Sequence, residues 1–205
     1  MPKLLLRTVA ASLLWLCAQL ATAGNQQYEP LAREMQTALA STIADRHVPR
    51  VQFERIADRI AYINWLAEMS ERLKTRHADY HARKEFLETL YYEAKRAGLE
   101  PALVLGLIQV ESGFKKYAVS SVGASGYMQV MPFWTTLIGD GDVRKLFHMR
   151  SNLRYGCTIL RHYVDIEKGD LFRALGRYNG SLGRPEYPNA VLGAWRQWEY
   201  QPKVK

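Results

Sequence analysis

The sequence feature that most constrains the fold is the stretch 102–110, in which every residue except Gln109 is apolar or glycine. Pro101 stands directly before it, and a proline is well tolerated in the first turn of a helix. A helix that is apolar on all sides offers no face to water and has to be buried among other elements. We therefore expect a globular core built around a helix over this stretch, which leads into Glu111.

The rest of the chain also favours helices. A stripe of apolar residues at helical spacing comes before the central stretch, with Gly98 as its expected C-cap. Its members are Phe86, Leu87, Leu90, Tyr91 and Ala94. Ser151 and Asp170 are expected N-caps of later helices, and residues 188–198 suggest a last one. Alternating strand patterns are scarce, so the expected fold class is all-α, mainly helical.

The first residues are typical of a secretory signal peptide. Lys3 and Arg7 supply positive charge, a mostly apolar stretch follows over residues 9–21, and small residues lead up to Ala23. This stretch is shorter than the roughly 20 residues that span a bilayer. We expect cleavage after Ala23, and a retained membrane anchor is the alternative.

Residues 28–97 contain few helix breakers, and apolar residues recur at helical spacing. Examples are Phe53, Ile56, Ile60 and Ile63. The segment 47–49, His-Val-Pro, interrupts this region, and the stretch 71–84 is polar enough to be an exposed helix or a linker. We therefore expect helices ahead of the central stretch.

Charge and cysteine content limit the partners. Removing Lys3 and Arg7 with the signal peptide reduces the basic residues from 28 to 26, against 20 acidic ones, for a formal charge of +6. A basic exported protein suits an acidic cell-wall polymer or a membrane surface, and export argues against nucleic acid. Cys157 is the one cysteine left, and its apolar neighbours predict a small buried hydrophobe.

Glu111 stands at the C-terminal end of the apolar helix. Burial and the negative end of the helix dipole both disfavour a carboxylate, so we expect a raised pKa. An acid that keeps its proton near neutral pH can protonate a glycosidic oxygen as the bond to it breaks. A Glu at a helix end is more often a surface residue or an ion-pair partner, so this interpretation depends on the residues that follow.

Three ordered motifs support it. The first is Glu111-Ser112-Gly113-Phe114 with the loop from Ser120 to Pro132, which reads Ser-x-x-Gly-Ala-x-Gly and then Tyr-Met-Gln-Val-Met-Pro. The second is Asn152-Leu153 with Gly156, and the third runs from Ala174 to Gly180. Over about residues 85–198 the chain resembles the soluble lytic transglycosylase family. The resemblance implies a lysozyme-like helical domain that cleaves the glycan strands of peptidoglycan.

The resemblance also assigns roles to residues around Glu111, the implied acid/base. Ser120 and the side chain of Gln129 are expected to line a cleft and contact the sugar next to the scissile bond. Met128 would form the apolar wall of that cleft. As structural alternatives, Met128 fills the core and Gln129 caps a turn.

Further residues are expected to support the site. Tyr178 and Asn179 match a family pair whose tyrosine points its hydroxyl at the catalytic carboxyl, so their hydrogen bonds would position that group. The alternative is that they simply end a helix. Ser112 is expected to make a supporting hydrogen bond to backbone rather than to sugar. Tyr127 replaces the family's usual leucine, where it would stack on a sugar or only pack.

A second catalytic carboxylate is not evident, although glycosidases usually use two. The other acids of this region lie beside turns or helix ends, where capping explains them; they are Asp140, Asp142, Asp165 and Asp170. One carboxylate suffices if the C6 hydroxyl of N-acetylmuramic acid is the nucleophile, which leaves 1,6-anhydromuramoyl ends. This mechanism needs no metal and no cofactor, and we expect none.

We therefore expect a signal peptide (1–23), a helical N-terminal extension of unknown role (24–83) and a lysozyme-like catalytic domain (84–200). The enzyme would be a monomer that acts on peptidoglycan strands in the bacterial periplasm. Within the periplasm it would be free or associated with the membrane. A cell-wall or secretion-machinery protein is a candidate partner of the extension. Two rival interpretations are a lysozyme-like hydrolase on the same fold and a non-catalytic peptidoglycan-binding scaffold.

Overall fold

The computed structural model describes residues 26, 28–45 and 51–201. The expected signal peptide over 1–23 and the interruption at 47–49 lie outside these residues. In the described part of the chain, helices form the structure and no strand occurs beyond isolated bridges in the loop after the central helix. The prediction of an all-α fold is confirmed. None of the described helices is both long and apolar enough to cross a membrane.

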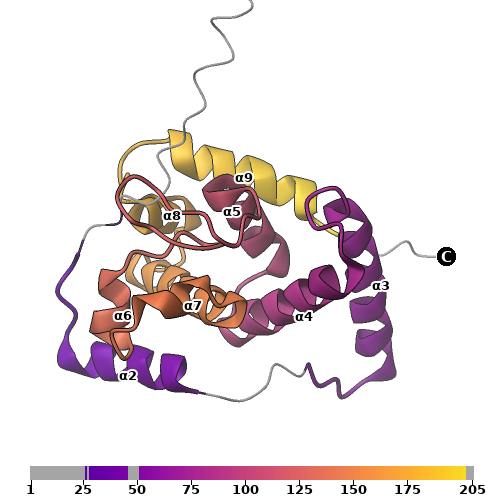
Figure 1. Ribbon diagram of the computed structural model, residues 1–205, viewed down its shortest axis with the longest axis horizontal. Helices are drawn as coiled ribbons and strands as arrows, with labels where there is room; N and C mark the ends of the chain where they lie inside the picture. Colours follow the sequence, from indigo (N-terminus) through magenta and orange to yellow (C-terminus); the bar gives the residue numbers. More distant parts are fainter. Residues whose placement is uncertain (1–25, 27, 46–50, 202–205) are drawn as a thin grey trace, which may run out of the picture.

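The helices surround the central one. In chain order they are α2 (Arg33–Ala44), α3 (Ile56–Leu73), α4 (Tyr80–Arg96), α5 (Pro101–Ser112), α6 (Phe133–Ile138), the 3₁₀ helix η1 (Val143–Phe147), α7 (Met149–Ile166), α8 (Leu171–Asn179) and α9 (Glu186–Trp198). Figure 1 shows α9 lying along α5, with α2 beside α6 and α7 at one end of the molecule and α3 beside α4 at the other.

The buried helix predicted over 102–110 is α5, with Pro101 in its first turn and nearly all its residues buried. Gly106 allows α9 to pack closely, because a Cβ there would lie 2.6 Å from the backbone nitrogen of Trp195. Each fully buried Leu or Val side chain stabilises the fold by about 1.5–3 kcal/mol. Because α5 is buried in this way and α9 packs closely on it, the position of the C-terminal end of α5 is fixed.

A buried ion pair joins α4 to α7. The Arg154 guanidinium donates from Nη2 to Oε1 of Glu93 at 2.8 Å and from Nε to the same carboxylate, and both side chains are buried.

Cys157, one turn further along α7, is buried as predicted. Gly98 follows α4 with a positive φ of 65°, as expected after a helix end.

The described part of the N-terminal extension is helical, and the isoleucines that showed the helical spacing lie on the exposed side of α3. Ile56, Ile60 and Ile63 are 80%, 53% and 52% exposed. The opposite side of α3 is buried instead, through Trp65, Met69 and Leu73. Two apolar stripes run along this helix, and the stripe with the larger side chains packs on the core.

The local predictions at helix starts fared differently. Asp170 caps α8 by accepting from the backbone nitrogen of Arg173, as predicted. Ser151 is not an N-cap: α7 begins at Met149, because the backbone nitrogen of Asn152 already donates to the carbonyl of His148. The polar stretch 71–84 is the end of α3, a loop and the start of α4.

Candidate active site

Glu111 lies at the buried end of α5. The helix stops at Ser112, and Gly113 takes the left-handed C-cap conformation with φ 57°. Because the helix ends there, the loop 113–132 begins just after the residue that carries the carboxyl group. Glu111 is only 6% exposed, so its carboxyl is held away from bulk water by its place in the fold.

The surroundings of Glu111 favour its protonated form. Burial raises its pKa to about 8, and a hydrogen bond from Tyr187 partly offsets the rise. The Tyr187 hydroxyl donates to Oε1 at 2.5 Å. Oε2 is buried and, among the described residues, has no hydrogen-bond partner. One oxygen is therefore held in place, and the other receives no hydrogen bond from the described residues.

Asn152 fixes the loop that passes over the end of α5. Its side-chain nitrogen donates to the carbonyls of Ser125 and Leu146, and its oxygen accepts from the backbone nitrogen of Met128 at 2.8 Å. Gly126 is required beside it, because a Cβ there would lie 2.3 Å from this side-chain nitrogen. The two motifs that contain Asn152 and Gly126 thus form one structural unit.

Ser112 ties the helix to the same loop. Its hydroxyl donates to the carbonyl of Tyr127 at 2.7 Å and is also within reach of the carbonyl of Ile108. This is the supporting hydrogen bond to backbone that we expected. The bond holds the loop against α5 one residue after Glu111.

Gln129 and Ser120 both stabilise the loop in this structure. Gln129 has a positive φ of 47° and donates from Nε2 to the carbonyls of Ala118 and Gly126. A left-handed conformation in a residue other than glycine is costly and occurs often at functional sites. Ser120 is half-buried, and its hydroxyl accepts from the backbone nitrogen of Ala124.

Met128 and Tyr127 are core residues in this structure. Met128 has no exposed surface and packs where a Cβ on Gly156 would collide with it. The expected apolar wall of a cleft is therefore corrected to a core contact. The centroids of the Tyr127 and Phe86 rings are 4.9 Å apart, and Tyr127 is only 4% exposed. Of its two expected roles, the structure shows packing.

Tyr178 does not hold Glu111 in the way we expected. Its hydroxyl donates to the carbonyl of Met128 at 2.8 Å. The tyrosine is fully buried, which together with the nearby Glu111 raises its own pKa. The partner of Tyr178 is a backbone carbonyl because that carbonyl is buried and needs a donor. Asn179 is buried at the end of the same helix, α8.

Tyr187, near the start of α9, is the residue that our sequence reasoning missed. It lies 76 positions after Glu111 and outside the motifs used above. The available signal was general: a buried acid needs a hydrogen-bond partner. Nothing in the local spacing selects this tyrosine, because the close α5–α9 packing brings it to the carboxyl.

The other acids of this region have local explanations. Asp142 caps η1, Asp140 pairs with Lys145, and Asp165 pairs with Arg161. Within the described ranges, His, Cys, Asp and Glu form no group of three or more that would hold a metal ion. The arrangement is that of a single buried acid, with one oxygen held by a tyrosine, next to a tightly braced loop.

Comparisons with known proteins point to one family. The transglycosylase SLT domain model matches residues 88–191, just over half of the 205 residues. The chain is 38% identical over 101 residues to membrane-bound lytic murein transglycosylase C of Actinobacillus pleuropneumoniae, covering 49% of this chain and 26% of that protein. It is 31% identical over 115 residues to the transglycosylase of Enterobacteria phage PRD1, covering 53% of this chain and 42% of the phage protein.

A solved structure is also similar. An inactive mutant of the lytic transglycosylase Slt from Pseudomonas aeruginosa has a TM-score of 0.44 and 23% identity, over 68% of this chain and 27% of that one. This likeness is too distant to bear on the site. The chain spans about a quarter of the length of the Actinobacillus relative.

Proposed function

The chain belongs to the transglycosylase SLT family, and from this premise we propose that it cleaves the β-1,4 bond between N-acetylmuramic acid and N-acetylglucosamine in peptidoglycan, without water, through Glu111. One observation carries the proposal. Glu111 is buried with a pKa raised to about 8, Oε1 is held by Tyr187, and Oε2 has no partner among the described residues. An acid with a proton at neutral pH and one unoccupied oxygen is what departure of a glycosidic oxygen requires.

In the first step, protonated Oε2 donates its proton to the bridging oxygen as the bond from C1 of N-acetylmuramic acid to that oxygen breaks. The sugar then carries positive charge at C1, and Glu111 becomes a carboxylate. Tyr187 keeps its hydrogen bond to Oε1 throughout, so the carboxyl group stays in one orientation.

In the second step, the Glu111 carboxylate accepts the proton of the C6 hydroxyl as that oxygen bonds to C1. The product is a 1,6-anhydromuramoyl end, and Glu111 has regained its proton. No second protein carboxylate is needed. The local explanations of Asp140, Asp142 and Asp165 support this route over one that uses a paired carboxylate.

The neighbouring residues take supporting roles in the proposal. Ser120 and the Oε1 atom of Gln129 bind the sugar next to the scissile bond, while Nε2 of Gln129 holds the loop. Tyr178 and Asn179 act on that loop from α8, through the carbonyl of Met128 in the case of Tyr178. Ser112 keeps the loop against α5.

We also propose that the protein is exported to the periplasm and works at the membrane or the wall. The charged and apolar pattern of the first residues supports export. The relative from Actinobacillus is named as membrane-bound. The formal charge of +6 expected after removal of residues 1–23 favours an acidic polymer or surface.

Mass spectrometry of the fragments released from purified peptidoglycan tests the function. The wild type should release fragments with anhydro ends, and the Glu111→Gln variant should release none. Glu111→Gln keeps the shape and the Tyr187 contact, and Asp142→Asn is a matched control that removes a half-buried capping carboxyl.

The same experiment separates the rivals. Reducing ends that take up heavy oxygen from labelled water would identify a hydrolase and overturn the anhydro mechanism. Binding of the polymer without release of any fragment would identify a scaffold. Equal release by the wild type and Glu111→Gln would show that another residue is the acid.

A further inference from the structure

A pocket lined by aromatic side chains lies at the end of α5 that points away from Glu111. Its volume is about 360 Å³, within the range of small-molecule sites. Residues of α3, α4, the start of α5 and the segment after α9 line it, and we call it the α3–α5 pocket. Pro101, the first residue of α5, belongs to the lining. Glu111 stands near the other end of the same helix, about 15 Å away along its axis.

The aromatic side chains of the lining are Phe53, Tyr62, Trp65, Tyr91 and Tyr200. Four of them pack on one another: the ring centroid of Tyr91 lies 4.7 Å from that of Tyr62 and 4.8 Å from that of Trp65, and Phe53 contacts Tyr62. Tyr200 is partly exposed, and its ring contacts no other aromatic ring in the described part of the chain. A ligand can therefore pack on the Tyr200 ring while the other four form a fixed wall.

The polar groups at the edge of this wall are not used by the protein. Four of them make no hydrogen bond or ion pair among the described residues: the hydroxyls of Tyr91 and Tyr200, the Lys95 ammonium and the Glu100 carboxylate. Burial, together with Asp58, raises the pKa of Tyr91, so its hydroxyl stays a donor at neutral pH. Glu100 precedes α5, yet its side chain makes no cap hydrogen bond. The pocket thus offers both donors and acceptors to a ligand.

The charges of the pocket balance. Asp58 is already bound by the Arg55 guanidinium through two hydrogen bonds. This leaves one amine, on Lys95, and one carboxylate, on Glu100. The Lys95 nitrogen lies over the Tyr91 ring, 5.8 Å from its centroid, and would repel a second cation there. A neutral ligand with hydroxyl or amide groups therefore fits these surroundings better than an ion does.

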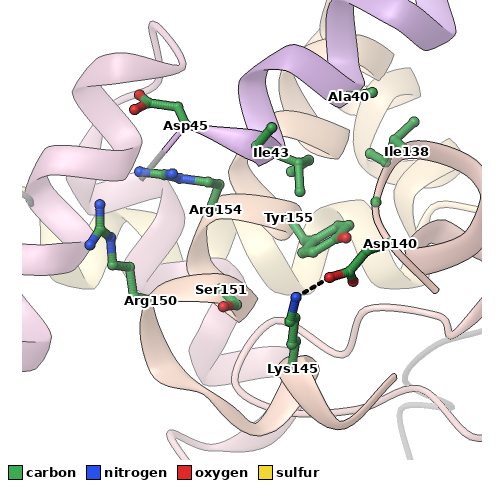
Figure 2. A pocket seen from close by; sticks show the side chains of 12 residues that line it. Ala40, Ile43, Asp45, Ile138, Asp140, Lys145, Arg150, Ser151, Arg154 and Tyr155 are labelled. Atoms are coloured by element: carbon green, nitrogen blue, oxygen red, sulfur yellow. Dashed lines mark hydrogen bonds and ion pairs between the residues drawn. The ribbon is translucent and has the colours of Figure 1, made fainter. Parts of the chain in front are cut away.

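The cavity between α2 and α7 differs in this respect, although it is larger, at about 620 Å³. Figure 2 shows its Lys145 paired with Asp140, and its Arg154 pairs with Glu93. These charged side chains are satisfied within the protein. Volume alone therefore does not mark a binding site, and the smaller α3–α5 pocket is the one with polar groups left for a ligand.

Small side chains complete the lining, among them Ala61 and Ala102. They leave room for a methyl group, such as that of an acetamido substituent. We propose that the α3–α5 pocket binds one N-acetylhexosamine of a peptidoglycan strand, with the sugar ring against Tyr200 and its hydroxyls at Lys95 and Glu100. This inference rests on the proposed function, since it takes peptidoglycan as the polymer.

The pocket gives the N-terminal extension a role. Tyr62 and Trp65 of α3 lie in the extension expected over 24–83, whereas Tyr91 and Tyr200 lie in the expected catalytic domain. A sugar held here is away from Glu111 and takes no part in bond cleavage. Because two contacts with one polymer raise its apparent affinity, the pocket keeps the enzyme on the wall.

Amide chemical shifts of the full chain, recorded during titration with three probes, test the proposal. The probes are the tetramer of N-acetylglucosamine, the tetramer of glucose, and tetramethylammonium. The N-acetylglucosamine tetramer should shift the amides of residues 58–65, 91–102 and 200, separately from any shifts around Glu111. The glucose tetramer should bind there more weakly, since it lacks the acetamido methyl, and tetramethylammonium should not bind.

Three variants assign the binding. Tyr200→Ala removes the ring against the sugar and should weaken binding in the pocket about ten-fold. Glu100→Ala removes an acceptor and should also weaken it; because Glu100 is exposed and makes no cap bond, this variant keeps the test valid if Tyr200→Ala does not fold. As a matched control, Tyr80→Ala removes a tyrosine that is 55% exposed and outside the lining, and should leave binding unchanged.

Kinetics give a second readout. On intact peptidoglycan, Tyr200→Ala should raise KM and leave kcat unchanged, because the pocket holds the polymer without touching the reacting atoms. On a short soluble glycan fragment that occupies only the Glu111 site, the variant should change neither value.

Several outcomes would overturn the inference. These are no shifts in the pocket residues with the N-acetylglucosamine tetramer, wild-type binding by both Tyr200→Ala and Glu100→Ala, equal binding of the glucose tetramer, or tighter binding of tetramethylammonium. Anhydro ends released by the same wild-type protein would then leave the proposed function standing. Binding of the tetramer in the pocket without any release of anhydro ends would instead overturn the proposed function alone.

Discussion

Two buried glutamates of this molecule have different surroundings, one in an ion pair that holds the fold and one at the site for which we propose chemistry. Glu93 on α4 is 1% exposed, and its carboxylate faces the Arg154 guanidinium through hydrogen bonds to both oxygens. Glu111 on α5 is 6% exposed, yet no cation pairs with it in the described part of the chain. Burial of a glutamate therefore says little about its role.

The partners decide the role. A buried charge needs an opposite charge and hydrogen bonds, and Glu93 has both. Glu111 has a tyrosine at one oxygen and nothing at the other among the described residues, so its proton is retained. A site that leaves a polar atom unsatisfied is less stable than one that does not. We take that cost as the mark of function here.

The largest expected effect comes from replacing the acid itself. Glu111→Gln should lower the rate of anhydro-product release by about 10³-fold, because general acid–base catalysis contributes on that order. The variant should fold normally. The measurement is turnover on purified peptidoglycan at pH 6, with binding of the polymer measured in parallel. A loss below about ten-fold would place Glu111 with Glu93, as a structural residue.

The reverse change acts on stability. Glu93→Gln removes the charge opposite Arg154, and breaking a buried pair in this way costs about 3–5 kcal/mol of unfolding free energy. Urea denaturation of the wild type and the variant measures the difference. Activity per folded molecule should stay near that of the wild type. Unchanged stability would contradict a structural role for the Glu93–Arg154 ion pair.

The pH dependence of stability sharpens the contrast. The folded-state pKa of Glu111, about 8, lies above the ordinary glutamate value of 4.5. The unfolded chain therefore loses this proton first, and stability falls as pH rises between these values. Glu111→Gln lacks this loss. Its unfolding free energy relative to the wild type should be unchanged near pH 4 and higher by a few kcal/mol near pH 8. Parallel stability curves for the two proteins would contradict the raised pKa.

The two glutamates also show what the sequence could predict. The apolar run of α5 is local, so burial of Glu111 and a raised pKa followed from it. The partner of Glu93 is 61 positions away and the partner of Glu111 is 76 positions away. No periodicity encodes such pairs, because they arise from the packing of whole helices. Tyr178 was expected at the carboxyl because the motif contains it, whereas helix packing placed Tyr187 there instead.

The same limit applies to α3. The apolar spacing within residues 28–97 predicted helices, and the structure has α3 over Ile56–Leu73. The spacing could not say which of two apolar stripes would be covered, since Ile60 and Met69 both fit the pattern. Their burial depends on α4, whose position relative to α3 is a tertiary property. Helix existence was predictable, and helix orientation was not.

The smallest expected effect tests the tyrosine that distinguishes Glu111 from a fully unpartnered acid. Tyr187→Phe removes the hydrogen bond to Oε1, and that bond lowers the pKa of Glu111. Without it the pKa should rise, so the alkaline limb of the kcat/KM profile should move to higher pH. The rate at pH 6 should fall about ten-fold, because the carboxyl is less well oriented. Tyr155→Phe removes a buried hydroxyl outside this site and should leave the limb in place. If Tyr187 is purely structural, Tyr187→Phe should lower the stability and leave the alkaline limb where it is in the wild type. That result would mean that Tyr187 is a core residue and that burial alone positions Glu111.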